Sequence, residues 1–145
     1  MSSADDNSAV AREVWQLMSD LVLDNQRRRK VTEVTGMSFG RTRAVRRVAK
    51  RSMQMGELAD LLGMERPNLT TLINDLEEKG LVIRKADPRD RRSRLVEATA
   101  KGKRVARKAE AILKEPPDRL VGLDVEDLET LRRCLAEASA PGGSE

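Results

Sequence analysis

The sequence predicts a mainly α-helical protein with one small β-hairpin. Apolar residues recur at helical spacing in 55–62 and again in 69–76, and the two apolar faces are in phase. Gly63 lies between these segments, where a tight turn needs a left-handed residue. After Gly80 the pattern changes to that of strands. Two helices joined by a short turn and followed by a hairpin form a winged helix-turn-helix domain, and we expect helices from both chain ends to flank it.

The N-terminal part is expected to begin with a disordered stretch, residues 1–8, and to continue as a helix over residues 9–35. The apolar stripe of this helix consists of Val10, Val14, Leu17 and Leu21, widened by Trp15, Met18 and Val22. A stripe of this width exceeds what a small peripheral helix needs and suits contact with a second subunit. We therefore predict that residues 9–35 form a dimerisation helix.

The winged helix-turn-helix domain is expected to occupy residues 36–98. Ser38 has the character of an N-cap for a helix that runs to about Lys50. Gln54 precedes the next helix at a position where Ser or Thr would be the better cap. Gly63 is expected to end that helix in a left-handed turn.

The helix from residue 65 to residue 79 is the candidate for DNA recognition. Its inward face is made of Leu69, Leu72, Ile73 and Leu76. Its outward face is made of Pro67, Asn68, Thr70, Thr71 and Asn74. Solvated helix faces usually carry Glu and Lys, whereas short hydrogen-bonding side chains can meet base edges in a major groove. We predict that the outward residues contact DNA.

A β-hairpin is expected after this helix, with strands near residues 81–83 and 93–98 and a charged loop over residues 87–92. The loop is longer and more basic than a turn requires, and an Arg at its tip suits a minor groove. Asp90 is predicted to hold the guanidinium of Arg92 in a bidentate pair. The predicted DNA contacts of this wing are Arg89, Asp90, Arg91 and Arg92. The alternative is a merely solvated loop.

Two further helices are expected over residues 99–138. The first carries the stripe Val105, Ala109, Ile112 and Leu113. Pro116-Pro117 stops it, and Asp124 has the character of an N-cap for the second. We assign both helices to a dimer interface, with packing on the winged domain of the same chain as the alternative. Residues 139–145, rich in small residues, are expected to form a disordered tail.

The composition favours a surface for a polyanion and argues against an enzyme. The 145 residues include 28 Lys and Arg against 24 Asp and Glu, a net charge of +4, with the basic runs in the middle of the chain. The sequence has no His, no Tyr and one Cys, so the usual nucleophile pairs and zinc ligand sets cannot be assembled within one chain. We expect no catalytic residue, metal or cofactor.

Cysteine usage predicts a reducing compartment. Cys134 cannot form an intrachain disulfide, and its position on an apolar helix face predicts that it is buried. One cysteine, with no signal-like or membrane-spanning apolar segment, favours the cytoplasm.

Several motifs resemble the MarR-type winged helix-turn-helix regulators of bacteria, over about Val10 to Leu135. The motifs are Gly-Glu-Leu-Ala-Asp-Leu-Leu-Gly at 56–63, Leu-Glu-Glu-Lys-Gly-Leu-Val at 76–82 and Thr-Ala-Lys-Gly at 99–102. The run Asp-Pro-Arg-Asp-Arg-Arg at 87–92 matches the family's Asp-x-Arg-Asp-x-Arg wing signature. The resemblance implies a homodimer that binds pseudo-palindromic promoter DNA and releases it when a small molecule binds. It also implies that Thr99 caps the long helix after the wing.

The resemblance further implies a ligand pocket between the dimerisation helices and the winged domain. Here its residues would be Trp15, Met18, Met37, Phe39 and Arg43. One departure is Asp75, which stands where the family usually has a basic residue and is expected to repel phosphate. A second is the absence of Cys from the N-terminal helix, so peroxide sensing by that residue is not expected.

The expected function is that of a dimeric, sequence-specific transcriptional regulator acting as a repressor. The 65–79 helix would contact the major groove and the 87–92 wing the minor groove. One alternative is an architectural DNA-binding protein. Its affinity for DNA would depend steeply on salt but would show little preference between promoter and random duplex. Another is a winged-helix module that binds proteins and shows no salt-dependent DNA binding.

Overall fold

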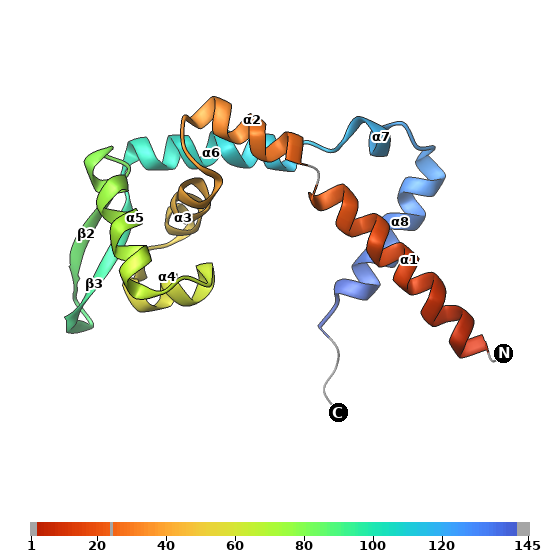
Figure 1. Ribbon diagram of the computed structural model, residues 1–145, viewed down its shortest axis with the longest axis horizontal. Coiled ribbons are helices and arrows are strands. Elements are labelled where there is room, and N and C mark those ends of the chain that lie inside the picture. The colour runs from red at the N-terminus through yellow and green to blue at the C-terminus, as the bar shows by residue number, and fades with distance from the viewer. Residues whose placement is uncertain (1–2, 24, 142–145) are drawn as a thin grey trace. The chain divides into compact units, whose positions relative to one another are not determined.

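A computed structural model describes residues 3–23 and 25–141, and the chain divides into two compact units, Met1–Lys114 and Glu115–Glu145 (Figure 1). In the first unit the elements are α1 (Ser3–Leu23), α2 (Asn25–Thr35), α3 (Phe39–Lys50), β1 (Met53–Gln54), α4 (Met55–Leu62), α5 (Arg66–Glu78), β2 (Val82–Asp87), β3 (Asp90–Ala98) and α6 (Ala100–Lys114). The second unit contains α7 (Asp118–Val121) and α8 (Val125–Ser139). The predicted fold class, mainly helical with a small antiparallel wing, is confirmed.

The helix-turn-helix consists of α4 and α5, whose predicted inward faces are buried in one apolar core with α3 and the sheet. Leu69, Ile73 and Leu76 of α5 are fully buried. Gly63 ends α4 with φ of +63°, and the N–H of Met64 donates to the carbonyl of Ala59 at 2.9 Å. The predicted left-handed turn is therefore confirmed.

Two predicted helix caps are confirmed. The hydroxyl of Ser38 accepts from the N–H of Arg41 at 3.4 Å at the start of α3. The hydroxyl of Thr99 accepts from the N–H of Gly102 at 3.0 Å at the start of α6, and it donates to the carbonyl of Gly80 at 2.6 Å. Thr99 therefore connects the start of α6 to Gly80, just after the end of α5.

The sheet has three antiparallel strands in the order β1-β3-β2. In it, β2 and β3 pair from Val82 opposite Ala98 to Asp87 opposite Asp90, so the connection is the two-residue turn Pro88-Arg89. The expected loop over 87–92 was too long, because Asp87 and Asp90 within it pair with each other. The register shifts between Ala86 and Asp87, so residues 91–93 have no partner in β2. The two-residue strand β1, paired through Met53 opposite Val96, was not predicted.

Helix α6 packs along α3 and α2. A small second core forms where Val31 of α2 meets Ala109 and Ile112 of α6. At the start of α6, Gly102 lies close to Leu81, between α5 and β2. A Cβ added to Gly102 would be 2.0 Å from the carbonyl oxygen of Leu81. A side chain at this position is excluded by the backbone of Leu81.

The N-terminal helix differs from its expected bounds. It is already helical from Ser3, within the stretch expected to be disordered, and α1 and α2 are separate helices rather than one over 9–35. Met1 and Ser2 lie outside the described residues. No described residue of α1 is buried: Val14, Leu17 and Leu21 of the predicted stripe are 47%, 64% and 41% exposed. Among the residues of the stripe, Met18 is half-buried and the others are exposed.

The second unit shows the same lack of cover. Its α8 has no buried residue, and Cys134, expected to be buried, is exposed because this small unit has no core of its own. Asp124 stands at the N-cap of α8 but makes no side-chain capping bond. The short α7 was not expected, and Ser139 is the last residue of α8 rather than part of a tail. The end of the expected tail, residues 142–145, lies outside the described residues.

Within residues 3–23 and 25–141, no helix combines the length and apolar character needed to cross a membrane.

Candidate DNA-binding surface

The outward face of α5 carries five exposed side chains: Pro67, Asn68, Thr70, Thr71 and Asn74. The hydroxyls of Thr70 and Thr71 donate to the carbonyls of Arg66 and Pro67 at 2.9 and 3.2 Å. Because each hydroxyl donates its hydrogen bond within the helix, its oxygen remains available to DNA only as an acceptor. The exocyclic amino groups of cytosine and adenine, which face the major groove, are donors that suit such acceptors.

Asn74 differs from the other four residues of this face. Its side-chain oxygen accepts a hydrogen bond from the guanidinium of Arg84 on β2. The same guanidinium is paired with Glu77 of α5, with Nε to Oε1 at 2.9 Å. The structure therefore places Asn74 in a contact that joins the recognition helix to the wing.

The wing carries Arg89, Arg91 and Arg92 with exposed side chains. The Asp90 carboxylate accepts from the backbone N–H of Arg92 and from the hydroxyl of Ser93, both at 3.0 Å. The predicted bidentate pair with the Arg92 guanidinium is not formed within the described chain. Asp side chains at turns commonly bond the backbone two residues on, so Asp90 shapes the start of β3 and leaves the guanidinium exposed.

Asp87, at the base of the wing, is a contact that sequence reasoning missed. It is 4% exposed, and its carboxylate accepts from the Gln54 amide at 2.6 Å and from the N–H of Arg89 at 2.9 Å. These hydrogen bonds, that of Gln54 first, lower the pKa of Asp87. Gln54 makes no side-chain capping bond to α4, as expected for a poor cap. Its amide instead ties the helix-turn-helix to the wing.

Asp75, expected to repel phosphate, lies between two cations. Its Oδ2 is 2.8 Å from Lys79 Nζ and 2.5 Å from Arg41 Nε, so it joins α5 to the start of α3. The hydrogen bonds of Lys79 and of Arg41 lower the pKa of Asp75. The negative charge on the recognition helix is thus offset locally by residues of the same chain.

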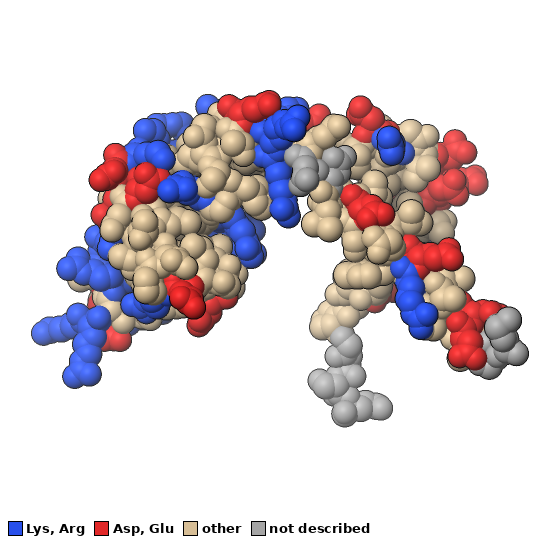
Figure 2. Space-filling model, viewed as in Figure 1, with Lys and Arg blue, Asp and Glu red and all other residues tan. Residues whose placement is uncertain are grey.

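Five arginines around the wing have exposed side chains and form no ion pair among the described residues. None of the ion pairs formed among the described residues includes Arg66, Arg89, Arg91, Arg92 or Arg94. Figure 2 shows Lys and Arg side chains projecting from the end of the molecule where Figure 1 places the turn between β2 and β3. Arginines without an ion-pair partner among the described residues thus lie on the hairpin beside the polar face of α5, although Arg84 and Lys85 of β2 are paired.

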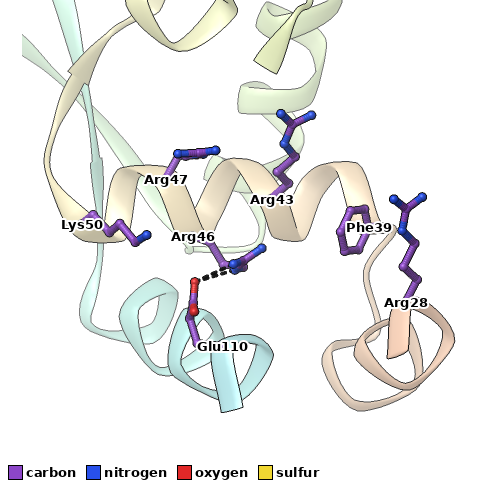
Figure 3. A pocket seen from close by; sticks show the side chains of 7 residues that line it. All are labelled: Arg28, Phe39, Arg43, Arg46, Arg47, Lys50 and Glu110. Carbon is purple, nitrogen blue, oxygen red and sulfur yellow. Dashed lines mark hydrogen bonds and ion pairs between the residues drawn. The ribbon is translucent and has the colours of Figure 1, made fainter. Parts of the chain in front are cut away.

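A second feature of the first unit is a hollow of about 390 Å³ beside α3 (Figure 3). It is lined by Arg28, Phe39, Arg43, Arg46, Arg47, Lys50 and Glu110. Arg28 lies over the Phe39 ring at 4.7 Å from its centroid. Burial opposes ionisation of Glu110, but the hydrogen bond from Arg46 and the nearby positive charges lower the pKa of its carboxyl overall.

Two residues of the predicted ligand pocket, Phe39 and Arg43, line this hollow. Met37 is 5% exposed and packs in the core of the winged region instead. Trp15 and Met18 lie on α1, where Trp15 is 68% exposed. The sequence did not single out Arg28, Arg46 or Glu110, because only the packing of α2, α3 and α6 brings them together.

A helix-turn-helix whose second helix has an exposed polar face, with a basic hairpin beside it, defines a winged helix-turn-helix protein. Residues 35–93 match the sequence model of the MarR family. These residues are therefore a MarR-family winged-helix region, and the resemblance seen in the motifs is confirmed.

Three solved structures are similar to nearly the whole chain. The YusO protein from Bacillus subtilis is 20% identical with a TM-score of 0.70, and the match covers 97% of this chain and 100% of YusO. The MepR–DNA complex of S. aureus is 17% identical with a TM-score of 0.57, covering 90% and 99%. NadR in complex with 4-hydroxyphenylacetate is 25% identical with a TM-score of 0.59, covering 97% and 94%. The chain has the fold of a MarR-family transcription regulator, a family of regulators and not of enzymes.

Proposed function

We propose that this chain is a dimeric, sequence-specific DNA-binding repressor. In this proposal α5 enters a major groove with Pro67, Asn68, Thr70 and Thr71, while Arg92 reaches the adjacent minor groove. The observation that carries the proposal is the group of unpaired wing arginines beside the exposed polar face of α5. Unpaired guanidinium groups attract the phosphate backbone, and short polar side chains on a rigid helix discriminate between bases. The chromosome as target makes the cytoplasm the proposed location.

The apolar stripe of α1 and the exposed apolar residues of α8, Val125, Leu131 and Leu135, support a homodimer. Leu17 on α1 is 64% exposed, and Val125 on α8 is 71% exposed. Contiguous exposed apolar stripes of this kind mark protein interaction sites. A two-fold dimer would present two copies of α5 and would bind a pseudo-palindrome with half-sites about 10 base pairs apart or a multiple of that.

The direct test is a titration of the purified protein with duplex DNA flanking its own coding region and with random duplex, at several salt concentrations. We expect a clear preference for the flanking duplex, a two-fold symmetric footprint, and repression of a reporter placed downstream. Equal, steeply salt-dependent binding to both duplexes would favour an architectural protein. No salt-dependent binding to either would favour a protein-interaction module.

The hollow beside α3 supports control by a small anionic effector. It gathers five cationic side chains around one acid, and Phe39 supplies an aromatic wall. These features suit an aromatic carboxylate, the class of the molecule bound to NadR in its solved complex. Since α3 also carries Arg41, which is bonded to Asp75 of α5, a ligand that shifts α3 would shift the recognition helix as well.

4-Hydroxyphenylacetate is the first probe for this effector site. We expect it to raise the melting temperature of the free protein and to weaken the protein–DNA complex, and Arg43→Ala to reduce both effects. If a panel of aromatic carboxylates changes neither quantity, constitutive repression replaces the effector proposal.

A further inference from the structure

We propose that a hollow between the start of α5 and the wing is a seat for one phosphate group of the DNA backbone, an inference that rests on the proposed DNA-binding function. The hollow measures about 170 Å³, several times the roughly 30 Å³ that a water molecule occupies in the liquid. It is lined by Gln54, Met55, Gly56, Arg66, Arg92, Ser93 and Arg94. Four separate elements, β1, α4, α5 and β3, therefore meet around it.

The charge of this phosphate seat is the main argument. Three of its lining residues are arginines and none is acidic. Two neighbouring arginines are paired with acids instead: Arg51 pairs with Glu57, and Arg84 pairs with Glu77. Arg66, Arg92 and Arg94 take part in none of the ion pairs formed by the described residues. Gathered like charges repel one another, and a phosphate, whose oxygens match the guanidinium fork, would relieve that repulsion.

Gly56 supports the seat sterically. A Cβ built on this residue would lie 3.1 Å from Nη1 of Arg66. The guanidinium of Arg66 is thus held against the first turn of α4, at a distance that a larger residue would disturb. Because only the far end of a flexible side chain is affected, substitution here would move the Arg66 charge without removing it.

The position of the seat gives it a role. Arg66 is the first residue of α5, and Arg94 belongs to β3 of the hairpin. A phosphate held between them would fix how far α5 enters the major groove and where the wing meets the next minor groove. Phosphate contacts set register without reading sequence, so the seat would contribute to affinity on every duplex.

The first experiment compares Arg66→Ala, Arg94→Ala and the control Arg107→Ala, an exposed arginine on α6, by DNA titration over a range of salt. We expect Arg66→Ala and Arg94→Ala to weaken binding to preferred and random duplex by similar factors, and to reduce the slope of log affinity against log salt by about 1 each. The control should change neither quantity. Unchanged affinity and slope in both test variants would overturn the seat.

Gly56→Ala provides a variant that keeps every charge. We expect weaker DNA binding with a melting temperature that is equal or higher, because Ala is the better helix former. This combination separates displacement of Arg66 from loss of stability. Wild-type affinity in Gly56→Ala would contradict the placement of Arg66 in the seat.

The most specific experiment scans a duplex with single neutral methylphosphonate linkages. For the wild type we expect one linkage in each half-site whose neutralisation weakens binding, and no further effect of that linkage in the Arg66→Ala/Arg94→Ala double variant. Additive losses at every linkage would overturn the seat while leaving DNA binding intact. If the wild type binds no duplex, the proposed function itself fails.

A competition experiment distinguishes a DNA phosphate from a free anion. Inorganic phosphate at matched ionic strength should not compete with DNA. Competition that disappears in the double variant would assign the seat to the free anion instead.

Discussion

Helices α5 and α1 both carry a regular apolar stripe, but only α5 buries it within the chain. Leu69, Ile73 and Leu76 of α5 are fully buried, whereas Leu17 of α1 is 64% exposed. The apolar face of α5 thus finds its partners within the same unit, in a core that also includes Ala106 of α6. The described residues of α1 and of α8 include none that is buried. In the proposed dimer these helices would bury their apolar residues against the second subunit. Stability and assembly should therefore respond to different substitutions.

The largest effect on stability is expected for Ile73→Ala in the core of the winged region. Ile73 is fully buried between α5 and its neighbours, and removing a buried aliphatic side chain typically costs about 2–5 kcal/mol. Denaturant unfolding at several protein concentrations measures this. A loss below about 0.5 kcal/mol, as for an ordinary surface position, would break the contrast with α1.

Leu17→Glu in α1 is expected to act on assembly instead. A charge in the exposed stripe would oppose burial against a second subunit, giving a monomer in light scattering after size exclusion and more than tenfold weaker binding to a two-site duplex. Gln16→Glu, which adds the same charge outside the stripe, is the matched control and should remain dimeric. A dimer in both variants would assign the interface elsewhere.

Substitutions on the DNA-facing surface should leave both stability and assembly unchanged. Arg92→Ala is expected to weaken binding by about 1–3 kcal/mol, while Asn68→Ala mainly relaxes the sequence preference. Titrations of matched and mismatched duplexes at one salt concentration distinguish the two. Wild-type affinity in Arg92→Ala would remove the wing from the interface, and equal weakening on all sequences in Asn68→Ala would make Asn68 a phosphate contact.

The smallest effect is expected for Gln54→Ala at the base of the wing. Loss of the amide hydrogen bond should raise the pKa of Asp87 toward its ordinary value, about 3.9. A lowered carboxyl pKa contributes stability above the ordinary pKa, and that contribution is lost as the pH falls through the lowered value. The wild type should thus exceed the variant in stability at neutral pH, with a gap that closes in acid. A gap independent of pH would mean that the amide does not act through Asp87.

The elements that the sequence predicted well are those specified by local rules. Periodicity located α4 and α5, Gly63 located the turn, and Ser38 and Thr99 located two caps, because each signal depends on residues a few positions apart. The strand β1 was missed, since two residues cannot show a pattern and only pairing with β3 makes Met53 a strand residue.

The sequence predicted which residues of the candidate DNA-binding surface are exposed, but it did not predict their side-chain contacts. The outward face of α5 and the exposed wing arginines follow from helical and hairpin geometry. Asp75 and Asp87 each have one distant partner, Arg41 and Gln54, which lie 34 and 33 residues away. Only the tertiary fold shows these two contacts. Arg66 and Arg94 were overlooked because neither belongs to the signature run at 87–92; their absence of acidic partners is visible only in space.

The start of α6 is packed tightly against residues 80–81, which directly follow α5. Gly102 approaches the carbonyl oxygen of Leu81 closely, and the hydroxyl of Thr99 donates to the carbonyl of Gly80. We therefore expect a rotation of α6 to move α5 with it. In the proposed dimer, the distance between the two copies of α5 would then be fixed. Operators with altered half-site spacing should bind more weakly.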